Sequence, residues 1–136
     1  MQLGLLVAAA GWGISFFFTF ASWSTAENQL RVMGAEAIPY QPLLAYWLRM
    51  ASSVFGCIGI ISLLAALKPK SFVGLIWLLG PFHFIVGTVL SIAAYQNQLL
   101  PKLHPTFIPD ITFCFLAGSL IQVPLFYEWS TRKREA

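Results

Sequence analysis

A chain of 136 residues that is 58% hydrophobic and only 10% charged has too few polar side chains to cover a water-soluble globule, so it belongs in a lipid bilayer. Its length suits one bundle, because each span needs roughly 20 apolar residues and four spans leave little room for a second domain. The formal net charge of +3 comes largely from the tail and one turn, which indicates membrane orientation and no nucleic-acid partner.

The first two spans are separated by a polar stretch. The first apolar run covers residues 3–23 and is expected to be a retained span, since it lacks the basic start of a secretory signal. Residues 24–41 are then predicted to form a polar loop. Pro42 stands where a helix can begin, and the second span is expected over residues 43–67.

The last two spans are also defined by prolines. Lys68-Pro69-Lys70 is a short basic turn, so the second span and a third span over residues 71–95 are expected to pack as an antiparallel hairpin. The next connection contains three prolines, and the last span is expected over residues 110–129. The prediction is therefore an all-α fold, in which residues 1–136 form a single integral membrane domain. Its four helices would make an antiparallel up-down bundle.

The distribution of basic residues predicts the orientation. Five of the eight Lys and Arg residues lie in the turn after the second span and in the C-terminal tail. The connections after the first and third spans hold only Arg31 and Lys102. Because cytoplasmic connections are enriched in Lys and Arg, both termini are expected to be cytoplasmic. Compactness and the lack of eukaryotic targeting signals lead us to expect the bacterial inner membrane.

Arg49 is the most informative charged residue of the spans. It lies about two turns into the second span, where an unpaired charge costs several kcal/mol. Three carboxylates are expected at the same end of the bundle, those of Glu27, Glu36 and Asp110. Asp110 is the favoured partner, because it opens the last span and so has a fixed height. The alternative is that Arg49 reaches the lipid headgroups or caps loop carbonyls.

His83 lies near the middle of the third span, two residues after Pro81 and on the face of Gly80 and Gly87. Pro81 leaves the carbonyl of Trp77 without its helical donor. An intramembrane histidine can relay protons, bind a metal or haem, or anchor a polar ligand group. The structural alternative is a neutral histidine bonded to a serine, glutamine or carbonyl on a neighbouring helix. No second ligand is suitably spaced, so no metal is expected.

Small residues mark the packing faces of the spans. The second span carries a broad strip of them, which predicts close approach of a neighbour and a central position for this span. The strip consists of Ser52, Ser53, Gly56, Cys57 and Gly59. Cys57 and Cys114 lie in apolar runs and are expected to be small core residues. Gln122 in the last span is expected to form a hydrogen bond across helices.

The second span also resembles a known family. Residues 46–67, Y-W-L-R-M-A-S-S-V-F-G-C-I-G-I-I-S-L-L-A-A-L, and the turn after them resemble the second span of small DoxX-like tetraspan proteins, particularly relatives of unknown function. The resemblance implies a four-helix membrane bundle over essentially the whole chain and a link to subunits of quinone-linked oxidation systems. Only Arg49, Gly56 and Gly59 carry over, with no catalytic role, whereas His83 and Pro81 lie outside the resemblance.

Two functions compete on this reading. The first is an accessory or interaction subunit of a membrane complex, with the bilayer, other membrane subunits or further copies of the chain as partners. The alternative is a binding protein or enzyme for an apolar ligand held between the helices, such as a quinone, isoprenoid or sterol-like lipid. No catalytic motif decides whether the protein is an enzyme, and no cofactor other than a quinone or lipid is indicated. The candidate ligand-binding residues are Arg49, Asp110, His83, Glu27 and Glu36.

Overall fold

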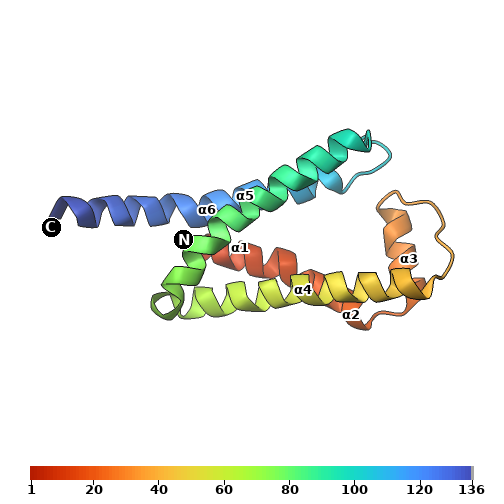
Figure 1. Ribbon diagram of the computed structural model, residues 1–136, viewed down its shortest axis with the longest axis horizontal. Helices are drawn as coiled ribbons and strands as arrows, with labels where there is room; N and C mark the ends of the chain where they lie inside the picture. The colour runs from red at the N-terminus through yellow and green to blue at the C-terminus, as the bar shows by residue number, and fades with distance from the viewer. Residues whose placement is uncertain (136) are drawn as a thin grey trace.

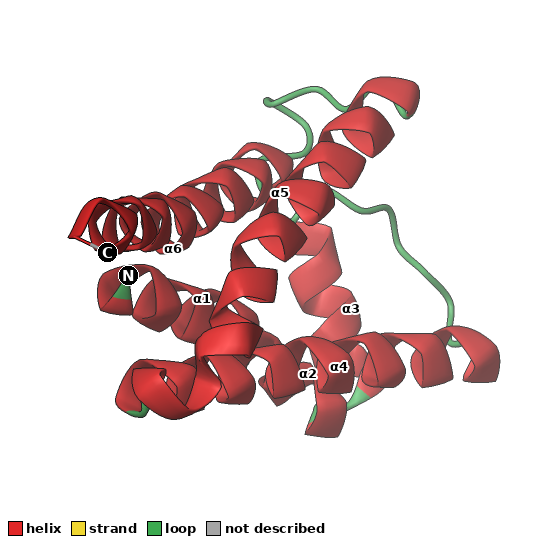
Figure 2. Ribbon diagram, turned by 60° about the vertical axis from the view of Figure 1, so that its left-hand side comes forward, coloured by secondary structure: helices red, strands yellow, loops and turns green. Residues whose placement is uncertain are grey.

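The computed structural model describes residues 1–135, with the side chains of all of them except residue 129 and residues 132–135. The described part is helical and contains no strand (Figure 2). Its elements in chain order are α1 (Gln2–Gly13), η1 (Ile14–Phe16), α2 (Phe17–Phe20), α3 (Trp23–Val32), α4 (Pro42–Leu67), η2 (Pro69–Phe72), α5 (Val73–Gln96) and α6 (Phe107–Glu135).

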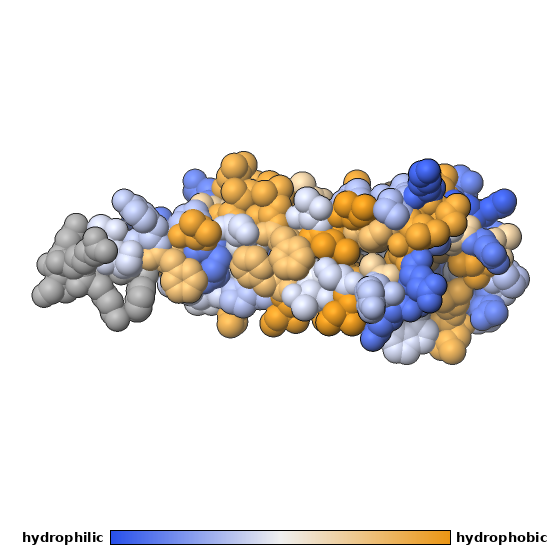
Figure 3. Space-filling view, turned by 90° about the horizontal axis from the view of Figure 1, so that it is seen from above, coloured by the Kyte–Doolittle hydropathy of each residue, from blue (hydrophilic) through white to orange (hydrophobic). Residues whose placement is uncertain are grey.

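Four helical segments are long and apolar enough to cross a membrane, as the sequence predicts. They are Gln2–Phe20, Pro42–Leu67, Pro69–Gln96 and Phe107–Glu128. Most of their large hydrophobic side chains are exposed on the isolated chain, where lipid can cover them. In Figure 3 hydrophobic atoms dominate the middle of the molecule, and hydrophilic atoms gather near one end. These features identify an integral membrane protein.

The helices form two pairs that diverge. α1 packs along α4, and α5 packs along α6, while α1 also contacts α6 and so joins the pairs. The pairs lie close together near Met1 and η2 and separate toward α3 and the connection between α5 and α6 (Figure 1). We call the first region the terminal end and the second the loop end.

The expected packing of the second span against the third is wrong. α4 and α5 are joined by the short turn at Lys68, but they make few contacts beyond it. The predicted central position of the second span is also wrong, because α1 lies between α4 and α6. α1 can do so because glycines allow close approach on two of its sides. A Cβ on Gly4 of α1 would meet the backbone of Leu120 at 2.7 Å, and a Cβ on Gly59 of α4 would meet the backbone nitrogen of Gly13 at 2.5 Å.

The polar stretch after the first span contains a helix that the sequence analysis missed. Ser22 caps the start of α3 by accepting a hydrogen bond from the backbone N–H of Thr25 at 3.2 Å. The end of α3 is closed by Gly34, which has a φ of +101°, and by the hydrogen bond from Ala35 N to Leu30 O. The α3 segment is therefore defined by local signals at both ends.

Gly34 also connects the two helix pairs at the loop end. A Cβ at this position would collide with the carbonyl oxygen of Leu103, which belongs to the connection between α5 and α6. Glycine therefore meets two requirements here, a left-handed backbone and a close backbone contact. As a result, α3 extends from the α1–α4 pair to the opposite pair.

The two cysteines differ in their surroundings. Cys114 is buried in the core, in agreement with the prediction. Cys57 is exposed, so its predicted core position is wrong. The strip of small residues on α4 is narrower than expected, because its buried members are Ser52, Gly56 and Gly59.

Replacing Gly59 tests the close packing of α1 on α4. A Cβ at Gly59 would lie 2.5 Å from the backbone nitrogen of Gly13, which cannot move aside as a flexible side chain can. Gly59→Ala should therefore lower the unfolding free energy in micelles by about 1–3 kcal/mol. The control is Gly74→Ala on α5, where a Cβ meets no atom within 4 Å. An equal loss of stability in both variants would contradict this packing.

Candidate functional site

His83 is completely buried, and both nitrogens of its ring have partners within the protein. Trp12 Nε1 lies 2.9 Å from His83 Nε2, and His83 Nδ1 lies 2.6 Å from the carbonyl oxygen of Leu79. An indole N–H can only donate, so Nε2 must accept and Nδ1 must carry the proton that is donated to Leu79. His83 is thus held as a neutral imidazole, with no free nitrogen for a ligand or metal.

An aromatic cluster encloses this hydrogen bond. The ring of Trp12 lies 5.0 Å from Phe55, 5.9 Å from Phe82 and 5.7 Å from Phe113, measured between centroids. Together with His83, these side chains come from α1, α4, α5 and α6, which are the four apolar spans. We call these five residues the aromatic cluster. The aromatic cluster forms an apolar core at the point where the two helix pairs meet. This core contains one buried polar contact, the hydrogen bond between Trp12 and His83.

His83 is hydrogen-bonded within the protein, as its structural alternative predicts, but its partners differ from those expected. The partners expected from the sequence are a serine, a glutamine or a carbonyl on a neighbouring helix. The structure instead provides the indole of Trp12 and a carbonyl of the same helix. A signal was present, since tryptophan favours membrane interfaces and Trp12 lies well inside the first span.

Gln122 is also buried but forms no hydrogen bond through its side-chain oxygen. Oε1 has no donor among the described residues, so the predicted bond across helices is not formed through this atom. A Cβ on Gly80 would overlap Gln122 Oε1, which shows that this oxygen occupies the space left by the missing side chain. Gln122 therefore packs directly against α5 at Gly80.

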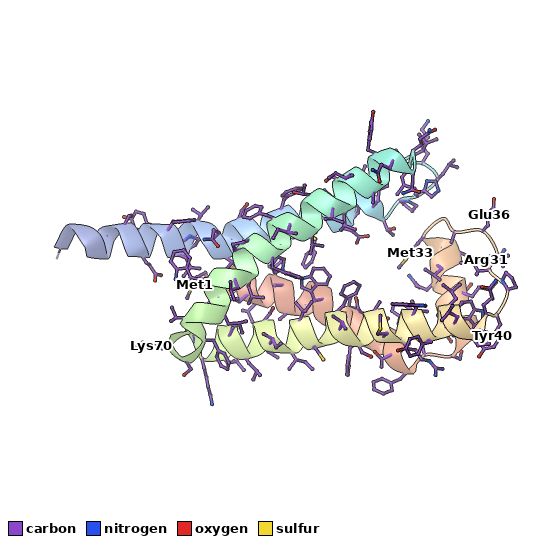
Figure 4. All side chains as sticks on the ribbon, in the orientation of Figure 1. Met1, Arg31, Met33, Glu36, Tyr40 and Lys70 are labelled. Atoms are coloured by element: carbon purple, nitrogen blue, oxygen red, sulfur yellow. The ribbon has the colours of Figure 1, made fainter. Side chains whose placement is uncertain are left out.

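Arg49 and Asp110, the favoured ion pair, belong to different surfaces. Arg49 is exposed on α4, whereas Asp110 lies at the start of α6 and lines a hollow of about 260 Å³ beside the end of α5. Among the described side chains, no Lys or Arg nitrogen lies within 4.0 Å of a carboxylate oxygen. Glu27 on α3 and Glu36 after it also lie at the loop end (Figure 4). The expected common end is therefore correct, but the ion pair is not formed.

Three adjoining hollows extend from Arg49 to the space beneath α3. The outer hollow measures about 510 Å³ and is lined by residues that include Tyr40, Pro42, Tyr46, Arg49, Met50 and Ser53. The narrow hollow measures about 20 Å³ and is lined by residues that include Phe18, Trp23, Ala26, Tyr40, Leu48 and Arg49. The inner hollow measures about 180 Å³ and is lined by residues that include Ser15, Phe18, Gln29, Met33, Leu48 and Ser52.

Shared walls show that these hollows are neighbours. Tyr40 and Arg49 line both the outer and the narrow hollow. Phe18 and Leu48 line both the narrow and the inner hollow. Met33, the residue directly after α3, lies toward the space between the helix pairs (Figure 4). The row therefore joins a cationic group at one end to a largely apolar space at the other.

Polar side chains line this row, and one of them has no hydrogen-bond partner within the described structure. Trp23 Nε1 is buried, and the described part of the chain offers it no acceptor. Ser53 and Ser62 donate to the carbonyls four residues earlier, at 2.7 and 2.8 Å, as helical serines commonly do. Ser52 is 5% exposed and lines the inner hollow. Of these groups, Trp23 Nε1 is the donor left without an acceptor among the described residues.

A comparison of the chain with protein families, curated proteins and solved structures finds no match. The DoxX-like resemblance stays a prediction. Within the described residues, no group of three His, Cys, Asp or Glu side chains could hold a metal ion. The geometry of the hollows is therefore the basis from which a function can be inferred.

A double-mutant cycle tests the pairing of Trp12 with His83. Trp12→Phe leaves His83 Nε2 buried without a donor and should lower the unfolding free energy by about 1–3 kcal/mol. His83→Leu should also destabilise the protein. The double variant should be less unstable than the sum of the two, with a coupling of roughly 0.6–1.7 kcal/mol, as measured by unfolding in mixed micelles.

The control for this cycle is Trp47→Phe, because Trp47 is 52% exposed on α4. It should change stability little, and its combination with His83→Leu should be additive. Additive losses for Trp12→Phe and His83→Leu would show that their hydrogen bond does not contribute to stability.

Proposed function

We propose that the protein binds an apolar, membrane-dissolved molecule whose head group accepts hydrogen bonds, with the head at Arg49 and the body beneath α3. Quinones, isoprenoids with an anionic head and sterol-like lipids belong to this class. The observation that carries the proposal is the row of adjoining hollows that leads from Arg49 to the inner hollow.

The donors at Arg49 define the head group. The guanidinium of Arg49 carries five N–H donors and a fixed charge, and Trp23 adds a buried N–H with no acceptor in the described structure. The narrow hollow between them, about 20 Å³, has room for one oxygen-sized group. A carbonyl, carboxylate or phosphate oxygen satisfies both the size and the donors. A cationic head would meet the like charge of Arg49 and is disfavoured.

The inner hollow suits an apolar body. Phe18, Leu48 and Met33 form part of its wall, and the flexible thioether of methionine adapts to ligands of different shape. Its volume of about 180 Å³ is below the roughly 300–1,000 Å³ of pockets that enclose a whole small molecule. Only part of the ligand is therefore enclosed, and the remainder lies along the spans in lipid. Met33 lies toward the space between the helix pairs, and this is the proposed side of entry (Figure 4).

The proposal includes an orientation. With the basic turn and tail on the cytoplasmic side, the spans alternate in direction and both termini are cytoplasmic. The row of hollows then faces the opposite side of a bacterial inner membrane. His83 takes no direct part in binding, because both of its nitrogens are used within the aromatic cluster.

An accessory role in a membrane complex is the competing proposal. Its specific support is that α4 and α5 make few contacts with each other, so their facing sides are left for another subunit to cover. Ligand binding explains more, because it also gives partners to Trp23 and Arg49. The same experiment distinguishes the two proposals.

Native mass spectrometry of the protein, extracted gently from its membrane, tests the proposed function. The wild-type chain should retain a small molecule of defined mass. Arg49→Gln removes a charge-assisted hydrogen bond worth about 1.5–3 kcal/mol and should lower the retained fraction at least tenfold. Met33→Trp should fill the inner hollow and lower retention as well.

The matched control is Arg31→Gln, because Arg31 is exposed on α3 and lines none of the three hollows. This variant should retain the molecule like the wild type. A stoichiometric protein partner with no small molecule would instead support the accessory role. Equal losses for Arg31→Gln and Arg49→Gln would show that the site is not at Arg49.

A further inference from the structure

A separate hollow of about 420 Å³ lies at the terminal end of the molecule. It is bounded by the turn after α4, the first part of α5 and the second half of α6. Its walls include Lys70, Val73, Ile76, Trp77, Leu125 and Glu128, and we call it the terminal hollow. Figure 4 labels Met1 and Lys70, which mark this end of the molecule. The proposed ligand site lies at the loop end, so the two sites are independent.

The terminal hollow is amphiphilic. Ile76 and Leu125 provide buried apolar walls, with 1% and 6% of their surfaces exposed. Trp77 adds an aromatic wall and is held edge-on against Phe126, at 5.4 Å between centroids. Lys70 and Glu128 are exposed, so opposite charges border an apolar interior. This is the pattern expected where a span meets the headgroup region, because a membrane-interface tryptophan presents both an apolar body and a polar edge.

The two charges stand on different elements and are not paired with each other. Lys70 belongs to η2 and Glu128 to α6, and their charged groups lie more than 4.0 Å apart. A molecule between them would need an anionic group facing Lys70 and a cationic group facing Glu128. A purely anionic head would be repelled by Glu128, and a purely cationic one by Lys70.

We propose that the terminal hollow binds a zwitterionic phospholipid. The phosphate contacts Lys70, the ammonium group contacts Glu128, and the upper part of an acyl chain lies along Val73 and Trp77. The volume of about 420 Å³ falls within the range of small-molecule sites and accommodates a headgroup with the first part of its chain. The indole face of Trp77 offers the ammonium group a further favourable contact.

Lipid retention measured by native mass spectrometry tests this site. The purified full-length chain is mixed with equal amounts of dimyristoyl phosphatidylethanolamine and dimyristoyl phosphatidylglycerol, which differ only in the headgroup. The wild type should retain the ethanolamine lipid in roughly fivefold preference. Glu128→Gln should abolish the preference, whereas Lys70→Ala should lower retention of both lipids, because both contain the phosphate.

Matched controls separate this site from general charge effects. Lys68→Ala changes the same turn but does not line the hollow, and Glu27→Gln removes a carboxylate at the loop end. Both variants should keep the wild-type preference. Val73→Trp, at a position 49% exposed, should fill the hollow and lower retention of both lipids without loss of folding.

Equal retention of the two lipids by the wild type would mean that the hollow holds ordinary boundary lipid, and this result would overturn the proposal. An equal loss of lipid retention in Lys68→Ala and Lys70→Ala would also overturn the proposal. Thermal unfolding of each variant confirms that the measured protein is folded. Loss of the molecule bound at Arg49 would leave these outcomes unchanged. Failure of the proposed function can therefore be distinguished from failure of the lipid site in the terminal hollow.

Discussion

The hydrogen bond between Trp12 and His83 is the contact on which the arrangement of the spans depends. The hydrocarbon interior has no water to satisfy a buried N–H or ring nitrogen, so the two side chains must meet each other. Their meeting fixes α1 relative to α5, which otherwise share few contacts. Rings from α4 and α6 then complete the aromatic cluster and exclude lipid from the contact. The four spans are thus held together at this level, and the two pairs diverge from it toward the loop end (Figure 1).

Glycines explain why the separation takes the form of two pairs. Gly59 lies against the backbone of Gly13, which brings α4 close to α1, and Gly4 brings α1 close to α6. No such contact joins α4 to α5, so these helices diverge from their turn. The row of hollows lies beneath α3 within the first pair, and Arg49 and Trp23 are among the residues that line it. The proposed ligand site therefore belongs to the part of the chain that ends with α4.

Hydropathy and prolines were sufficient to predict the four spans, because span length is set by the thickness of the bilayer. They could not predict which faces meet, since a strip of small residues allows close approach without specifying the neighbour. This is why the sequence placed α4 at the centre and Cys57 in the core. The α3 helix was missed because its caps at Ser22 and Gly34 are short local signals within a polar stretch. For His83, burial and pairing were predictable, but the partner Trp12 lies 71 positions away in sequence.

The pairing of the helices has a consequence for how the chain is made. Each pair consists of spans that are consecutive in sequence, α1 with α4 and α5 with α6. As the chain enters the membrane during synthesis, the first pair can form before the third span arrives, because its contacts are complete without it. Trp12 then has no acceptor until α5 inserts and brings His83 to the same depth. The contacts thus allow assembly in two local steps followed by one joining step, and the Trp12 indole gains its His83 acceptor only in that last step.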